Sequence, residues 1–173
     1  MNEESLLPVD RFLQTLEIVR REGEHLDWSR GRLAAESIDA EWVRAADDAP
    51  ERAERMEAFV SRFGRMQDTI ADKLLPRWLL ALAETPGSQI EVLNRAERLG
   101  VIEDLEDWLE VRRLRDRLVH EYMRDPETFA EDLCRTRAHT DMLLDTYERV
   151  RRFAVERMGL DSTAVPVSLA GAE

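Results

Sequence analysis

Residues 129–154, FAEDLCRTRAHTDMLLDTYERVRRFA, decide the fold class of this chain. Apolar and small side chains recur along this stretch at alternating intervals of four and three residues, which places them on one face of an α-helix. Such a face is typical of a helix in an antiparallel bundle or in a dimer interface, and the pattern leaves that choice open. Its members are Phe129, Leu133, Thr136, Thr140, Leu143, Tyr147, Val150 and Ala154.

A second apolar stripe follows Pro50 and predicts another long helix in the same bundle. Pro76 lies inside this pattern and predicts a kink, and the run 85–88, TPGS, predicts the turn that ends the helix. The members of the stripe are Met56, Phe59, Phe63, Met66, Ile70 and Leu74.

Helical patterns cover most of the remaining chain, and no useful β-alternation appears in it. The sequence therefore predicts an all-α fold, an up-and-down helical bundle of four main helices plus one or two short helices. We expect a single domain over residues 1–159 and a disordered tail over residues 160–173, where no periodicity remains. The further helices are expected from near Asp10 to Leu33, over 41–46, over 89–99 before Gly100, and over 104–124 before Asp125 and Pro126.

Composition limits the function. Cys134 is the only cysteine and no apolar run reaches the roughly 20 residues of a membrane-spanning helix, so we expect a cytoplasmic protein without disulfides or membrane contact. The net charge of −12 argues against broad, sequence-blind binding to nucleic acid. Arginines nevertheless crowd into residues 112–124, and charges are screened over roughly 8 Å at physiological salt. A focused phosphate site is therefore compatible with the acidic chain.

The run 115–122, RDRLVHEY, is the sharpest chemical pattern in the sequence, and we call it the motif. The planar fork of Arg115 suits phosphate oxygens, and an imidazole such as His120 takes and gives protons near neutral pH. Asp116 lies four residues before His120, so its carboxylate is expected to accept a hydrogen bond from the ring and fix its tautomer. Tyr122 lies seven residues after Arg115, on nearly the same helical stripe.

The motif resembles the signature of the HEPN superfamily, in which an arginine and a polar residue precede a histidine. It is more narrowly similar to the HepT toxins, which add a tyrosine two residues after the histidine. The preceding residues 93–114 are also similar to that family, and so is the run 61–76, SRFGRMQDTIADKLLP, to which no role is assigned. In these toxins the polar position is often asparagine, whereas this chain has Asp116.

This resemblance implies a ribonuclease toxin of a type VII-like toxin–antitoxin pair, which works without metal or cofactor and forms a homodimer. The roles implied are phosphate binding for Arg115, catalysis for His120 with Asp116 beside it, and modification for Tyr122. The cognate antitoxin would be a nucleotidyltransferase that adds AMP to this tyrosine. Arg112 and Arg117 are predicted to assist in binding RNA.

The residues also support the dimer independently of the family. Cleavage of RNA by the neighbouring 2′-hydroxyl needs both a base and an acid, and His120 is the only histidine with plausible partner residues nearby in the sequence. Two copies would supply both roles.

Asp68 and Asp72 lie four residues apart but lack a third ligand at helical spacing, so no metal site is predicted.

Three alternatives stay open. The bundle is also compatible with a non-catalytic companion subunit that binds substrate for a nucleotidyltransferase. A purely structural interaction protein, with the last helix as its interface, is the second alternative. In the simplest interpretation of the motif, Arg115 is a surface residue, His120 pairs with Asp116 and Tyr122 packs between helices.

Overall fold

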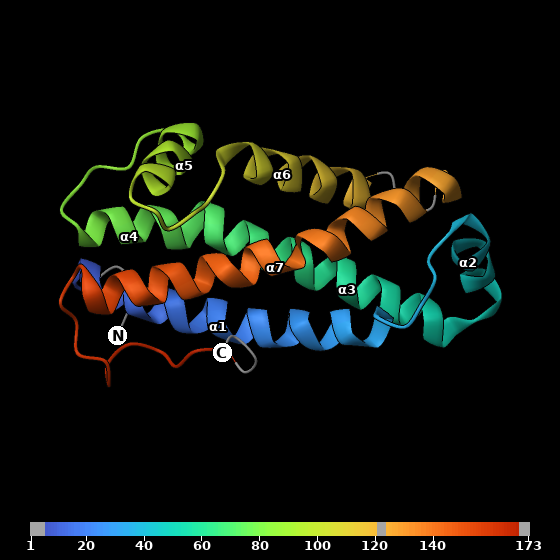
Figure 1. Ribbon diagram of the computed structural model, residues 1–173, viewed down its shortest axis with the longest axis horizontal. Helices are drawn as coiled ribbons and strands as arrows, with labels where there is room; N and C mark the ends of the chain where they lie inside the picture. Colours follow the sequence, from blue (N-terminus) through green and yellow to red (C-terminus); the bar gives the residue numbers. More distant parts are fainter. Residues whose placement is uncertain (1–5, 121–123, 170–173) are drawn as a thin grey trace.

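The computed structural model describes residues 6–120 and 124–169, and it confirms the all-α bundle: within these residues there is no β-strand. Four long helical rods lie alongside one another and alternate in direction (Figure 1). None of the described helices combines the length and the apolar character needed to cross a membrane. The rods are α1 (Pro8–Leu33), α3 with η3 and α4 (Pro50–Thr69, Ile70–Leu74, Leu75–Ala81), α6 (Leu105–His120) and α7 (Pro126–Glu156); α2 (Ala40–Arg44), η2 (Ala45–Asp48) and α5 (Gln89–Arg98) are short.

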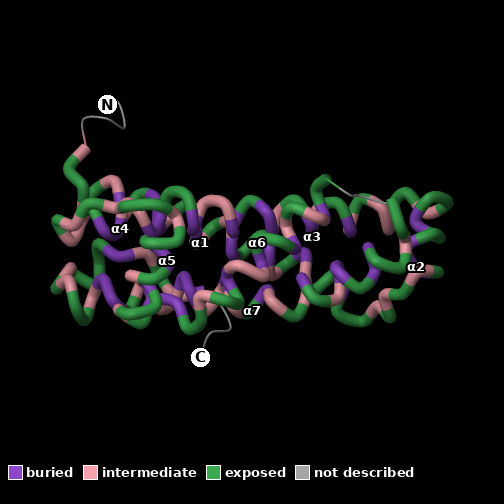
Figure 2. Tube along the Cα trace, turned by 90° about the horizontal axis from the view of Figure 1, so that it is seen from above, coloured by how far each residue is buried: buried purple, intermediate pink, exposed green. Residues whose placement is uncertain are grey.

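The predicted face of α7 lies in the core of the bundle. All eight of its members are buried, and α7 packs against α1, α2, α3 and α6. Buried positions line the inner sides of the rods throughout the molecule (Figure 2). The repeat of four and three residues in α7 is therefore a bundle core within one chain, and the alternative of a dimer interface on this face is excluded by its burial.

The rod from α3 to α4 contains the irregularity that Pro76 predicts, one turn earlier than expected. Residues Ile70–Leu74 form a π turn, in which the N–H of Leu75 donates to the carbonyl of Ile70, five residues back. Pro76 has no N–H to donate, so a regular α-helical ladder cannot continue through this point. The wider turn keeps the rod continuous while both Ile70 and Leu74 stay buried.

Local signals explain most helix ends. Ser88 and Glu91 form a reciprocal capping box at the start of α5, and Gly100 after its end has a φ of +78°, which favours glycine. Helix α1 starts at Pro8, two residues before the expected start at Asp10, because proline fits the first helical position. Helix α6 is described as far as His120, and Arg124, its predicted end, lies in a turn; residues 121–123 lie outside the described part.

The prediction of a disordered tail is wrong for residues 160–169. This segment folds back along α1 and α7 (Figure 1). Leu169 is buried against Gly23 of α1, so closely that a Cβ at the glycine would lie only 3.2 Å from Cδ1 of Leu169. The carboxylate of Glu148 accepts hydrogen bonds from Ser168 and from the N–H of Leu169. Side chains of α7 therefore fix the segment, and a search for helical periodicity does not detect such contacts. Residues 170–173 lie outside the described part.

Tyr147 connects the tail to α7 by a hydrogen bond, and its buried hydroxyl should make the free energy of unfolding fall at alkaline pH. Its buried hydroxyl donates to the carbonyl of Val167 at 2.5 Å; burial, and then the charge of Glu148, raise its pKa above the ordinary value of 10.0. Above about pH 10 the unfolded state loses this proton while the folded state keeps it, so unfolding becomes easier by up to about 1.4 kcal/mol per pH unit. Urea unfolding at pH 8 to 11 should show this fall, and Tyr147→Phe should reduce it. An equal fall in both proteins would contradict the assignment.

Candidate functional site

The motif arginine lies in a groove between α3 and α6, which we call the Arg115 groove. Its volume is about 610 Å³. One wall comes from α6, and the other comes from α3 and η3, within the run 57–73. The segment 61–76, which had no assigned role, therefore faces the motif helix. The lining residues are Glu57, Val60, Ser61, Gly64, Arg65, Asp68, Thr69, Asp72, Lys73, Arg115, Leu118 and Val119.

Arg115 crosses from α6 to α3 and is held by two carboxylates. Its Nη2 donates to Asp68 Oδ2 at 2.8 Å and its Nη1 to Asp116 Oδ1 at 3.3 Å. Partial burial alone would lower the pKa of Arg115, but the hydrogen bonds and charges of Asp68 and Asp116 outweigh it and raise the pKa. The Nε is buried and has no hydrogen-bond partner among the described residues, although the side chain as a whole is 26% exposed.

Gly64 lies beside this crossing. A Cβ at this position would lie 3.5 Å from Arg115 Cγ and 3.7 Å from its Nε, which is ordinary van der Waals contact, so the side chain of Arg115 packs directly over this part of α3. Asp68 follows one turn later on the same face of α3 and meets the guanidinium. The π turn begins two residues further on and carries Asp72 and Lys73 into the groove lining. Such turns are rare and frequently occur at functional sites.

The expected pairing of Asp116 with His120 is absent. Both residues are described, both are exposed, and no hydrogen bond joins them; Asp116 accepts from Arg115 instead. His120 ends the described part of α6 and is not in the groove lining. Five residues of α-helix separate it from Arg115, which sets the two side chains about 140° apart around the axis. In the single chain His120 therefore lies outside the Arg115 groove.

Arg117 differs most from its predicted role. Its Nε and Nη2 donate to the two carboxylate oxygens of Asp132, each at 2.9 Å, and Asp132 is only 7% exposed. This ion pair joins α6 to α7, so Arg117 has a structural role and we no longer count it among the phosphate ligands. Arg112 is exposed on α6, three residues before Arg115 and therefore on the same side of the helix. Tyr122, the predicted site of modification, lies outside the described residues.

Sequence reasoning missed the contribution of α3. It considered Asp68 only as a metal ligand, and Gly64 and Lys73 not at all. The signal available was the similarity of the run 61–76 to the same family as the motif, but no periodicity rule converts two separate similar runs into a contact. Among the described residues, no three or more His, Cys, Asp or Glu side chains are grouped so that they could hold a metal ion.

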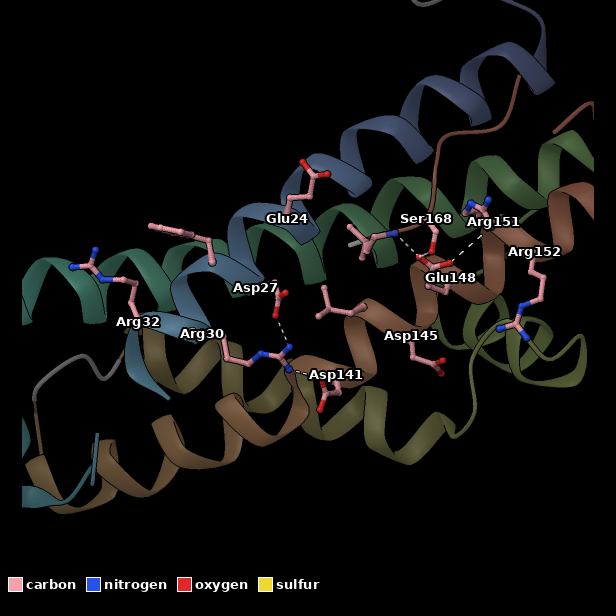
Figure 3. A pocket seen from close by; sticks show the side chains of 14 residues that line it. Glu24, Asp27, Arg30, Arg32, Asp141, Asp145, Glu148, Arg151, Arg152 and Ser168 are labelled. Carbon is pink, nitrogen blue, oxygen red and sulfur yellow. Dashed lines mark hydrogen bonds and ion pairs between the residues drawn. The ribbon is translucent and has the colours of Figure 1, made fainter. Parts of the chain in front are cut away.

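A larger hollow of about 1110 Å³ lies between α1, α7 and the tail, away from the motif (Figure 3). Five carboxylates and four arginines line it. Arg30 pairs there with both Asp27 and Asp141, and Glu148 is bound to the tail. Acids outnumber bases in this hollow, whereas the lining of the Arg115 groove has three of each, so the hollow is less suited to an RNA strand.

Comparisons with known proteins add no assignment: no family model matches the chain, and neither curated proteins nor solved structures give a match. The candidate site therefore depends on the residues and geometry described above.

Proposed function

We propose that this protein is a metal-independent endoribonuclease toxin in which Arg115 binds the scissile phosphate and His120 transfers protons. The observation that carries the proposal is the guanidinium of Arg115 in an open groove. A guanidinium has five N–H donors, and the bonds to Asp68 and Asp116 use two of them. Of the three remaining donors the Nε–H is buried, whereas the second N–H of Nη1 and of Nη2 has no hydrogen bond among the described residues and is left for a phosphate oxygen.

The active form that we propose is a homodimer. His120 and Arg115 of one chain point in different directions, so a compact site needs His120 from one copy near Arg115 of the other. Two histidines would also supply the base and the acid of the reaction. Val119, 46% exposed between the motif residues, gives apolar area to such a contact.

A nucleotidyltransferase antitoxin is the proposed regulator. AMP on the hydroxyl of Tyr122 would bring a phosphate anion and a nucleotide to the stripe of Arg115, seven residues away, and would compete with RNA for it. We expect the modified protein to lose RNA binding before it loses its fold.

An RNA cleavage assay in excess chelator tests the function. The parent protein should cleave single-stranded RNA, and Arg115→Ala should lower the rate by about 10²- to 10³-fold, the typical cost of losing a group that stabilises transition-state charge. Arg115→Lys should restore little, because an ammonium lacks the planar fork. Arg113→Ala is the matched control, since Arg113 is exposed on the same helix and pairs only with Glu110 among the described residues. Equal activity of the Arg115 and Arg113 variants would overturn the proposal.

The second candidate is a non-catalytic companion of a nucleotidyltransferase. One observation favours it: Asp68 and Asp116 already neutralise Arg115, which is the arrangement of a structural arginine. The same assay separates the candidates. A companion would show no cleavage and would bind the nucleotidyltransferase with Arg115 intact or replaced.

A further inference from the structure

The only lysine of the chain lies in the Arg115 groove. The sequence contains 25 Lys and Arg residues together, and the single lysine among them is Lys73, in the π turn. An ammonium differs from a guanidinium in being a compact charge with three rotatable donors. At this position it lines the groove together with Arg115 and Arg65.

Lys73 and Arg65 are exposed and have no ion pair within the described residues, although ion pairs occupy many other arginines of the chain. Arg65, Thr69 and Lys73 follow one another at intervals of four residues, along one side of the rod. Eight residues of helix place the two cations roughly 12 Å apart along the axis, with Arg115 reaching in from the opposite wall.

Three acids line the groove beside its three cations, but none of them forms an ion pair with Lys73 or Arg65 among the described residues. Asp68 is bound by Arg115, Asp72 accepts a hydrogen bond from the neutral amide of Gln89, and Glu57 is the third acid. Glu22 of α1 bonds Thr69 through one oxygen; burial raises its pKa, and Thr69, Arg65 and Lys73 partly offset that rise. Glu22 is partly buried behind Thr69, whereas the two cations face solvent.

The described residues that line the groove include no aromatic side chain. Stacking platforms of the kind that bind unpaired bases are therefore absent from this described lining. Its cations are spread along a groove between two helices. This arrangement suits contact with a phosphate backbone, which is independent of sequence and strongly dependent on salt.

We propose that Lys73 and Arg65 bind the phosphates that neighbour the one held by Arg115, so that a single strand of RNA lies along α3 through the Arg115 groove. This assignment rests on the proposed ribonuclease function and names its substrate as single-stranded RNA bound through its backbone. Lys73 is a binding residue in this assignment and takes no part in proton transfer.

The single lysine provides a direct test by chemical protection. The intact protein is treated with an amine-acetylating reagent, with and without saturating single-stranded 2′-O-methyl RNA, which binds but cannot be cleaved. Peptide mapping separates Lys73 from the amino terminus. We expect the strand to slow acetylation of Lys73 several-fold, and a duplex of the same sequence at equal concentration to protect it less. Equal acetylation with and without a bound strand would overturn the assignment.

The salt dependence of RNA binding is the second test. For single strands the slope of log K against log [salt] is about −0.7 for each phosphate contact. Lys73→Met should therefore reduce the steepness of the slope by about 0.7, and Lys73→Arg should restore it. Arg98→Met is the matched control, because Arg98 is exposed on α5 outside the groove.

The two proposals fail in distinguishable ways. If the parent cleaves RNA while Lys73→Met keeps the parent slope, the groove assignment is wrong and the ribonuclease stands. If the parent neither binds nor cleaves RNA, both are wrong. If it binds a strand with protection of Lys73 but does not cleave, the groove assignment stands and the catalytic function is wrong.

Discussion

His120→Ala should lower the rate of chelator-insensitive RNA cleavage by about 10²- to 10⁴-fold, the usual contribution of a general acid or base. His120 is exposed at the end of the described part of α6, so its removal should change the free energy of unfolding by less than about 0.5 kcal/mol. The measurements are cleavage rates with an excess of enzyme and urea unfolding of the same preparations. His25→Ala is the control, because His25 is also exposed and lies on α1.

Mixing variants tests whether the site is shared between copies. If His120 of one chain serves Arg115 of its partner, subunits with Arg115→Ala and subunits with His120→Ala should regain part of the activity when they are mixed and allowed to exchange. The composite dimer then brings one His120 to the Arg115 of the other copy but has only one of the two histidines, so the recovery should be partial. No recovery after proven exchange would contradict the shared site, and full activity of a monomer would contradict the dimer itself.

Arg117→Leu should destabilise the protein by about 3 kcal/mol, because it leaves the buried carboxylate of Asp132 without its bidentate partner. In a chain of this length that corresponds to a fall of about 6–12 °C in Tm. Asp132→Leu should cost less, since Arg117 is 33% exposed and its guanidinium can turn to water. Thermal unfolding of both variants checks the order.

Two further variants sharpen this prediction. The double variant Arg117→Leu with Asp132→Leu should recover much of the lost stability, because an apolar pair replaces an ion pair that cost desolvation. Arg113→Leu, which breaks an exposed pair with Glu110, should cost less than about 1 kcal/mol. Equal losses for Arg113→Leu and Arg117→Leu would mean that burial of Asp132 adds nothing.

The fold was predictable because its signals are local. The spacing of apolar residues in α3 and α7, the capping box at Ser88 and the glycine after α5 are each contained within one stretch of chain. The tail was mispredicted because its order depends on Tyr147, Glu148 and Gly23, which lie on other elements.

The candidate site was only half predictable for the same reason. The motif identified Arg115, but its partner Asp68 is 47 residues away on another helix. Helical spacing allowed an Asp116–His120 pair, but the nearby guanidinium of Arg115 takes the carboxylate instead. Arg117 was indistinguishable from its neighbours in the sequence, because only the packing of α6 on α7 brings it to a buried carboxylate.

The π turn at Ile70–Leu74 determines the phase of the whole rod. Buried positions at Ile70, Leu74 and Trp78 are four residues apart, a spacing that drifts by about 40° per step around a regular α-helix. One wide turn absorbs this drift and keeps α4 facing the core. The wide turn also sets the direction, around the helix axis, in which the side chains of Asp72 and Lys73 point. The rod is thus two helices of different phase joined end to end: α3 packs against the motif helix α6, and α4 packs against α5.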